Sequence, residues 1–131
     1  MGEIMRVSHT AVYVKNLEET RKYYEKYFGA ESNTLYHNPR TGLKTYFLTF
    51  ECGGKLEIMS KPELSEIGVN GEHSGYSHFA FSAGDEESVD RLTEQLRSDG
   101  YTVFSEPRTT GDGYYESCVS DPDGNRIEIV A

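Results

Sequence analysis

Two histidines and two glutamates recur in this chain at nearly equal intervals. The interval from His9 to His78 almost equals the interval from Glu57 to Glu128. Two neutral imidazoles and two carboxylates balance the charge of a divalent cation. They also supply the nitrogen and oxygen donors that suit Ni²⁺, Zn²⁺, Co²⁺, Fe²⁺ or Mn²⁺ better than the ions that thiolates select. The repeat therefore predicts a metal site made of these four residues.

The alternation of residues along short strands predicts where the four side chains point. In KLEIMS (55–60) and NRIEIV (125–130) each glutamate stands between apolar residues, and in GYSHFAFS (75–82) phenylalanines alternate with His78. Because the apolar side chains must cover the face packed on helices, the histidines and glutamates project from the opposite, concave face. Taken singly, each of them is an ordinary solvated strand residue. Their recurrence at matching places favours the metal site.

The segments around these residues predict the same order of elements twice. MRVSHTAVYV (5–14) alternates as a strand, and the following residues 16–29 form a helix with Asn16 as its N-cap, Gly29 at its end and an apolar stripe of Leu17, Tyr24, Tyr27 and Phe28. Three strands follow, at about 30–36, 43–50 and 55–60. The second half repeats this order, with a strand at 75–82, a helix at 85–100 and strands near 101–107, 113–120 and 125–130.

The predicted fold is therefore of the α+β class, with two tandem βαβββ modules. Module 1 covers about residues 4–60 and module 2 about residues 75–131, with a polar connector near 61–75. The whole chain, residues 1–131, has the length of one domain.

Composition excludes several other classes of protein. The 22 acidic residues outnumber the 13 basic ones, so the net charge of −9 argues against a nucleic-acid binder. No apolar run is long enough to span a membrane, and no signal peptide is recognisable at the N-terminus, so we expect a cytoplasmic protein with no membrane partner. Cys52 and Cys118 form no CxxC motif, and we expect both to be free thiols, with Cys118 in the core.

Four stretches of the sequence resemble the vicinal oxygen chelate superfamily, which includes glyoxalase I, extradiol dioxygenases and the fosfomycin and bleomycin resistance proteins. They are SHTAVYVKNLEETRKYYEKYFG, KLEIMS, GYSHFAFS and DPDGNRIEIV, and the DPDG turn leading into an I-E-I strand is the most specific. The resemblance implies that the two modules form an open barrel around a metal cleft. It also implies a small-molecule substrate and a homodimer.

By motif position, His9, Glu57, His78 and Glu128 are similar to the four metal ligands of the glyoxalase I branch. That branch, of the lactoylglutathione lyase type, isomerises the hemithioacetal of a 2-oxoaldehyde to a 2-hydroxyacyl thioester through an enediolate, with a divalent metal ion as cofactor. The resemblance gives Glu128 the role of principal base and makes Glu57 the second catalytic carboxylate.

The sequence departs from that branch at two places and leaves other functions open. Tyr13 stands where an arginine helps to bind glutathione, and Lys61 replaces an asparagine, so the thiol is not fixed. Arg108, Lys61 and Arg126 are candidate anion contacts or simply surface charges. An Fe(II) dioxygenase, an antibiotic-resistance thiol transferase and a non-catalytic bleomycin-type binding protein are the alternatives on the same scaffold, although the fourth ligand disfavours them.

Three further features of the chain bear on the site. The stretch 109–124 carries glycines before two tyrosines, and it is either a loop that closes over the site or an ordinary hairpin. His37 and His73 fall in turn-rich segments without partners in the repeat, so neither is assigned to the site.

Overall fold

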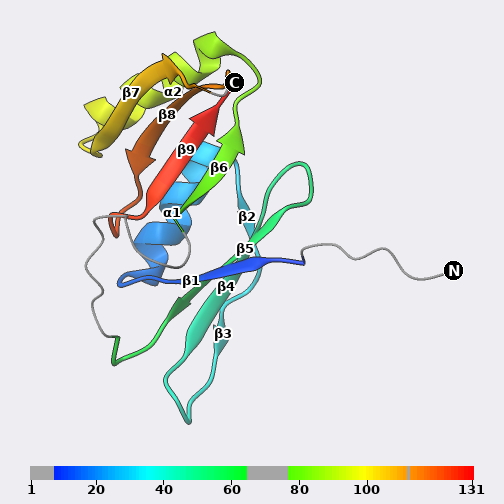
Figure 1. The fold of residues 1–131 in the computed structure, drawn as a ribbon. Helices are drawn as coiled ribbons and strands as arrows, with labels where there is room; N and C mark the ends of the chain where they lie inside the picture. The colour runs from blue at the N-terminus through cyan, green and yellow to red at the C-terminus, as the bar shows by residue number, and fades with distance from the viewer. Residues whose placement is uncertain (1–7, 65–76, 112) are drawn as a thin grey trace, which may run out of the picture. The chain divides into compact units, whose positions relative to one another are not determined.

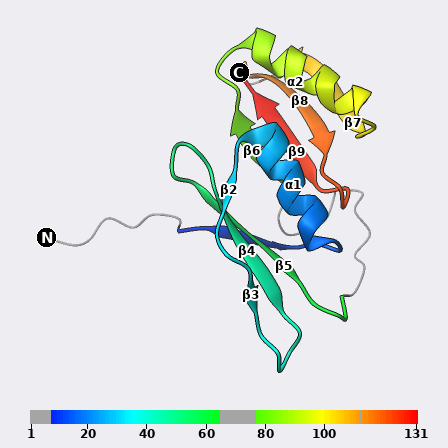
Figure 2. The same ribbon diagram turned by 180° about the vertical axis from the view of Figure 1, so that it is seen from behind.

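A computed structural model describes residues 8–64, 77–111 and 113–131 of the chain. The chain divides into two compact units, residues Met1–Glu66 and Ile67–Ala131. In its described residues, each unit contains one helix and one sheet (Figures 1 and 2). The described part contains no helix that is both long and apolar enough to cross a membrane.

The first unit begins with a strand, continues with a helix and ends with a strand pair. Its elements are β1 (Thr10–Tyr13), α1 (Leu17–Phe28), β2 (Glu31–Ser32), β3 (Tyr36–His37), β4 (Lys44–Thr49) and β5 (Lys55–Ser60). The sheet order is β1-β5-β4-β2, and β3 also pairs with β4. The first strand pairs in parallel with the last, whereas the other pairs are antiparallel.

The second unit repeats this topology. Its elements are β6 (His78–Ser82), α2 (Glu86–Ser98), β7 (Val103–Thr109), β8 (Tyr115–Ser120) and β9 (Arg126–Val130), in the sheet order β6-β9-β8-β7. Here too the first strand, β6, pairs in parallel with the last, β9, which runs between β6 and β8 in Figure 1. The second unit shows the predicted order of elements, the first unit shows it with one strand divided into β2 and β3, and the predicted α+β class is confirmed.

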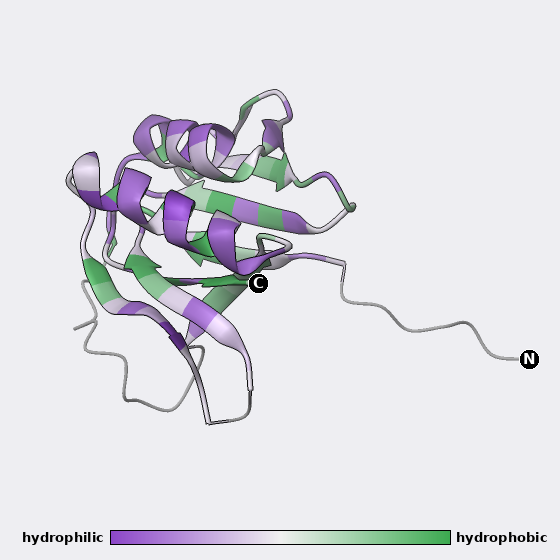
Figure 3. Cartoon of the chain, turned by 90° about the horizontal axis from the view of Figure 1, so that it is seen from above, coloured by the Kyte–Doolittle hydropathy of each residue, from purple (hydrophilic) through white to green (hydrophobic). Residues whose placement is uncertain are grey.

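Each helix covers one face of its own sheet. Helix α1 packs on β4 and β5, and α2 packs on β7 and β8 (Figure 2). Burying each large aliphatic side chain contributes about 1.5–3 kcal/mol. In Figure 3 hydrophilic residues make up much of both helices, and the strands show alternating hydrophilic and hydrophobic bands. The fully buried side chains include Tyr24, Leu48 and Ile58 in the first unit and Leu96, Val119, Ile127 and Ile129 in the second.

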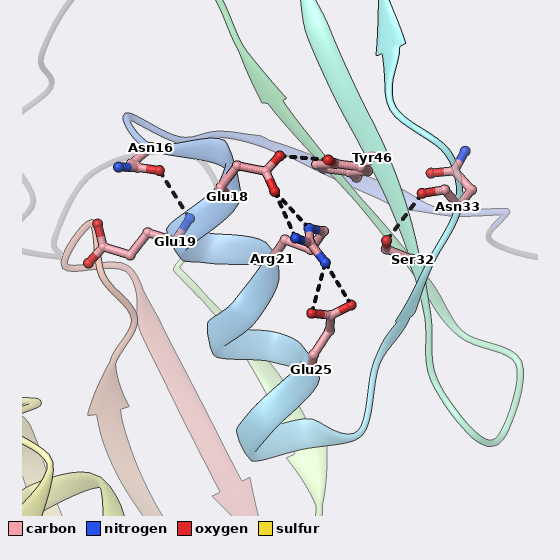
Figure 4. Close-up of polar contacts among 8 residues, drawn as sticks. All are labelled: Asn16, Glu18, Glu19, Arg21, Glu25, Ser32, Asn33 and Tyr46. Atoms are coloured by element: carbon pink, nitrogen blue, oxygen red, sulfur yellow. Dashed lines mark hydrogen bonds and ion pairs between the residues drawn. The ribbon is translucent and has the colours of Figure 1, made fainter.

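Helix α1 begins and ends where the sequence predicts. The side chain of Asn16 accepts a hydrogen bond from the Glu19 amide (Figure 4), and Gly29 ends the helix in the left-handed conformation at φ 66°. The predicted stripe is partly wrong, because the buried side chains of α1 are those of Leu17, Thr20, Tyr23 and Tyr24, while Tyr27 and Phe28 are half-buried.

The strand predicted at 30–36 is split in two. Residues 33–35 separate β2 from β3, and the side chain of Asn33 accepts a hydrogen bond from the Phe47 amide at 2.8 Å. Ser32 also donates its hydroxyl to the Asn33 carbonyl. These side-chain bonds compete with the regular ladder and interrupt it. His37, expected in a turn, lies on β3, whereas most of the connector near 61–75, including His73, lies outside the described residues.

A hydrogen bond between a helix carboxylate and a strand tyrosine ties helix to sheet in each unit. Tyr46 on β4 donates to Glu18 on α1 at 2.6 Å (Figure 4), and Tyr115 on β8 donates to Asp90 on α2. The bond from Tyr46, followed by that from Arg21, lowers the pKa of Glu18. The bond to Asp90 raises the pKa of Tyr115 to about 12. The tie from Tyr46 is therefore strongest while Glu18 is ionised.

We predict that Tyr46→Phe lowers the free energy of unfolding by about 0.5–1.5 kcal/mol at pH 7. Since the pKa of Glu18 is lowered by folding, this stability is present above the ordinary value of 4.5 and is lost as the pH falls through the folded value. Urea unfolding of the wild type and of Tyr46→Phe at pH 7 and at pH 3.5 measures the difference in the free energy of unfolding. Tyr36→Phe, at an exposed strand position, is the control. A cost that does not shrink at low pH would contradict the assignment.

Candidate metal centre

In the first unit, the parallel pairing of β1 with β5 brings His9 to Glu57. The His9 Nε2 atom lies 3.7 Å from the Glu57 Oε1 atom. Leu56 and Ile58 on either side of Glu57 are buried, so the glutamate points to the opposite face, as alternation predicts. The residue beside Glu57 on β1 is Ala11, whose small side chain leaves the carboxylate accessible. The side chains of His9 and Glu57 are 38% and 19% exposed.

The second unit builds the same pair from β6 and β9. The His78 Nε2 atom lies 3.1 Å from the Glu128 Oε1 atom, and the two side chains are 38% and 24% exposed. Alanine again stands beside the glutamate, because Ala80 is the β6 neighbour of Glu128. Each predicted histidine thus contacts the predicted glutamate of its own unit.

The separations within both pairs fit two donors on one cation. Donors held about 2.1 Å from an ion lie about 3.0 Å apart at a right angle and about 3.4 Å apart at the tetrahedral angle. The observed 3.1 Å of the second unit lies between these values, and the 3.7 Å of the first unit is slightly longer than the larger one. Among the described residues of either unit, no group of three or more His, Cys, Asp or Glu side chains forms a metal site. Each unit therefore supplies two candidate donors.

A serine before each histidine contacts the other ring nitrogen. The Ser8 hydroxyl lies 3.1 Å from His9 Nδ1, and the Ser77 hydroxyl lies 3.1 Å from His78 Nδ1. A hydroxyl can donate to a bare Nδ1 or accept from a protonated one, so it accommodates either tautomer while Nε2 faces the glutamate. Neither serine was predicted as part of the site, although the Ser-His dipeptide recurs in both halves of the sequence and could have indicated them.

The DPDG turn sets the position of β9 and hence of Glu128. The Asp121 carboxylate is buried and accepts hydrogen bonds from the amides of Asp123 and Asn125 and from the Asn125 side chain. Burial outweighs these bonds and raises the pKa of Asp121. Gly124 adopts φ 83°, which a side chain would strain. This closed turn starts β9 in the register that places Glu128 beside Ala80.

The three candidate anion contacts each interact with a neighbouring group. The Lys61 ammonium lies 5.7 Å from the centre of the Tyr13 ring, and the Arg126 guanidinium lies 4.4 Å from the centre of the Phe104 ring. Arg108 donates to the Glu116 carbonyl.

Cys118 is buried, as predicted, and its burial raises the pKa of its thiol, whereas Cys52 is exposed. Of the two interpretations of 109–124, the described residues match the hairpin, because β7 pairs with β8 up to Thr109 and Tyr115 and the Thr110 amide bonds to the Tyr114 carbonyl.

Residues 6–129 match the model of the Glyoxalase/Bleomycin resistance protein/Dioxygenase superfamily. The chain belongs to this superfamily. Among curated proteins, it is 30% identical to the uncharacterized protein YqjT of Bacillus subtilis over 129 residues, covering 94% of this chain and 96% of that protein. It is 28% identical to a lactoylglutathione lyase of Haemophilus influenzae over 130 residues, covering 96% of this chain and 92% of the lyase.

Among solved structures, this superfamily member is similar to the fosfomycin resistance protein FosX of Listeria monocytogenes, whose structure contains Mn(II) and a sulfate ion. The TM-score is 0.73 at 25% identity, over 98% of this chain and 93% of that one. The family predicted from the sequence is thus confirmed. Its members named here have different activities, so the superfamily alone does not assign a reaction.

We predict that Ser77→Ala weakens the binding of Zn²⁺ on the order of tenfold, because it removes the partner of His78 Nδ1 that orients the ring. Competition with a chromophoric chelator measures the affinity. Ser82→Ala, on the same face of β6, is the matched control and should bind Zn²⁺ like the wild type. Equal affinities for all three proteins would show that the serine does not support the site.

Proposed function

We propose that this protein is a divalent-metal-dependent lyase of the glyoxalase I type. Its reaction would convert the hemithioacetal of a 2-oxoaldehyde and a thiol to a 2-hydroxyacyl thioester. The observation that carries the proposal is the repeated His–Glu pair, with Nε2 directed at the carboxylate in both units. Membership of the superfamily and the 28% identity to a lactoylglutathione lyase support it.

In this proposal His9, Glu57, His78 and Glu128 hold one divalent ion jointly, which makes the two units parts of one site. Two neutral imidazoles and two carboxylates cancel the charge of such an ion. When bound, the metal ion would stabilise the negative charge that develops on two adjacent oxygen atoms of the substrate. The serines at Nδ1 would keep both imidazoles oriented with Nε2 toward the ion.

The isomerisation moves one proton between adjacent carbons, and a carboxylate is the base available to carry it. We assign this role to Glu128, which would accept the proton from the carbon bearing sulfur and return it to the neighbouring carbon. Its strand neighbours, Ala80 and Cys118, are small. Glu57 instead has Phe47 beside it on β4, and the Phe47 ring packs against His9 with 5.1 Å between centroids. Glu128 therefore has more freedom to move than Glu57, which would serve as the second carboxylate.

The thiol is a separate question, because Tyr13 and Lys61 replace the residues that the glyoxalase I branch uses for glutathione. Turnover should be assayed with hemithioacetals of several thiols. The protein would work in the cytoplasm, where thiols stay reduced, and as a homodimer. The similarity to FosX supports one alternative, a fosfomycin resistance activity. That alternative would be favoured if the protein consumes fosfomycin, either by adding a thiol to it or by hydrolysing it, and converts no hemithioacetal.

We predict that the purified protein contains one divalent ion per chain and that His78→Ala loses it. Elemental analysis and titration of the metal-free protein with Zn²⁺ measure the stoichiometry. His37→Ala, an exposed histidine on β3, is the control and should retain the ion. If the two pairs share one ion, His9→Ala must lose it as well. A protein that folds without binding any divalent ion would overturn the proposal.

We predict that Glu128→Gln reduces kcat at least about 100-fold while most of the metal stays bound, because a general base contributes about 10²–10⁴-fold. The amide keeps an oxygen donor but cannot accept the proton. Glu87→Gln, an exposed residue of α2, is the control with the same loss of charge. Turnover retained by the Glu128 variant would remove this residue as the base.

A further inference from the structure

Two arginines of the second unit lie close to the strand face that carries His78 and Glu128. Arg126 alternates with the buried Ile127, so it shares the face of Glu128, and it is also the β9 neighbour of His78. Arg108 lies on β7, opposite Glu116. Both arginines act on the thiol of Cys118, the β8 neighbour of Glu128, in the direction that lowers its pKa, although burial prevails. In the sheet register, Arg108 lies opposite Glu116 and Arg126 lies opposite Ser120, so the two arginines flank Cys118 along β8.

The guanidinium of Arg126 is held by an aromatic ring. It stacks over Phe104 on β7, 4.4 Å from the ring centre, although Phe104 itself is 37% exposed. The Cys118 thiol is a hydrogen-bond partner of Arg126, and because the guanidinium carries five N–H donors, others of them can bind a ligand. The residue is thus oriented in advance for an oxyanion, and binding would require little ordering of the side chain.

The arginines on the helices have different surroundings. Arg21, Arg91 and Arg97 each form an ion pair with a carboxylate. In the described part of the chain, neither Arg108 nor Arg126 has a carboxylate within ion-pair distance, and Arg108 bonds to the backbone carbonyl of Glu116 rather than to its carboxylate. In a protein with a net charge of −9, unneutralised guanidinium groups beside the candidate site match an anionic ligand.

We propose that Arg126, stacked on Phe104 and assisted by Arg108, forms an anion subsite that binds a carboxylate or phosphate-type group of the substrate. The claim that this ligand is the substrate rests on the proposed function. The claim that the subsite binds an anion does not depend on it. Arg126 reaches from β9 across β8 toward β7, so the bound group would lie one to two strand spacings, about 5–10 Å, from Glu128. The subsite therefore selects compact substrates whose negative charge is close to the reacting oxygens.

The test measures binding of inorganic phosphate and of acetate to the metal-free, full-length protein at constant ionic strength, with chloride as the reference anion. Proton–nitrogen NMR follows the Arg126 Nε–H group and the backbone amides of β7, β8 and β9. We expect saturable shifts centred on Arg126, and an affinity on the order of tenfold weaker in Arg126→Gln. Arg91→Gln makes the same change on exposed α2 and should bind like the wild type.

The variants and the two anions separate the outcomes. Arg126→Lys preserves the charge but not the planar stack, so it should bind with intermediate affinity, and it replaces the glutamine variant if that one fails to fold. A preference for acetate indicates a carboxylate group, and a preference for phosphate indicates a phosphate or phosphonate group; either supports the subsite. Shifts no larger than those with chloride, or equal affinities in Arg126→Gln and the wild type, would overturn it. Because no metal is present, failure of the proposed lyase activity leaves this result unaffected.

Discussion

The parallel pairing of the first and last strands of each unit is the constraint on which the rest of the structure depends. It places the histidine, which lies just before β1 in the first unit and at the start of β6 in the second, near the glutamate of the last strand. In the sequence, a helix and most of the sheet lie between the two residues. Register matters as much as pairing. A slip by one residue would turn each glutamate into the apolar layer under the helix and bring an isoleucine or leucine to the polar face.

The sequence predicted what alternation and repetition encode. The orientations of Glu57 and Glu128 follow from their buried neighbours, and the start and end of α1 follow from the chemistry of Asn16 and Gly29. Features that depend on a single side-chain conformation could not be predicted in this way. The contacts of the two serines with the imidazoles and the interruption of the strand at Asn33 are of this kind. The sharing of one ion by both pairs stays a prediction, because no strand pattern encodes a coordination number.

The two units share one strand topology but differ in the residues that neighbour the glutamate. Phe47 stands beside Glu57 and packs on His9, whereas Cys118 stands beside Glu128. Lys55 stands two positions before Glu57, and Arg126 stands two positions before Glu128. Of these two cations, only Arg126 lies over an aromatic ring in the described structure. The repeated scaffold thus keeps a matching His–Glu contact in both units, while the residues beside each glutamate differ between the units.

The burial of Cys118 has a consequence for the lifetime of such a protein. A 2-oxoaldehyde or an epoxide is an electrophile, and a thiolate beside the position where it is held would be alkylated during turnover. Because burial raises the pKa of this thiol, the group stays protonated at neutral pH and is a weak nucleophile. If the substrate is such an electrophile, as the proposed function implies, the strand next to Glu128 offers no thiolate that would compete for it.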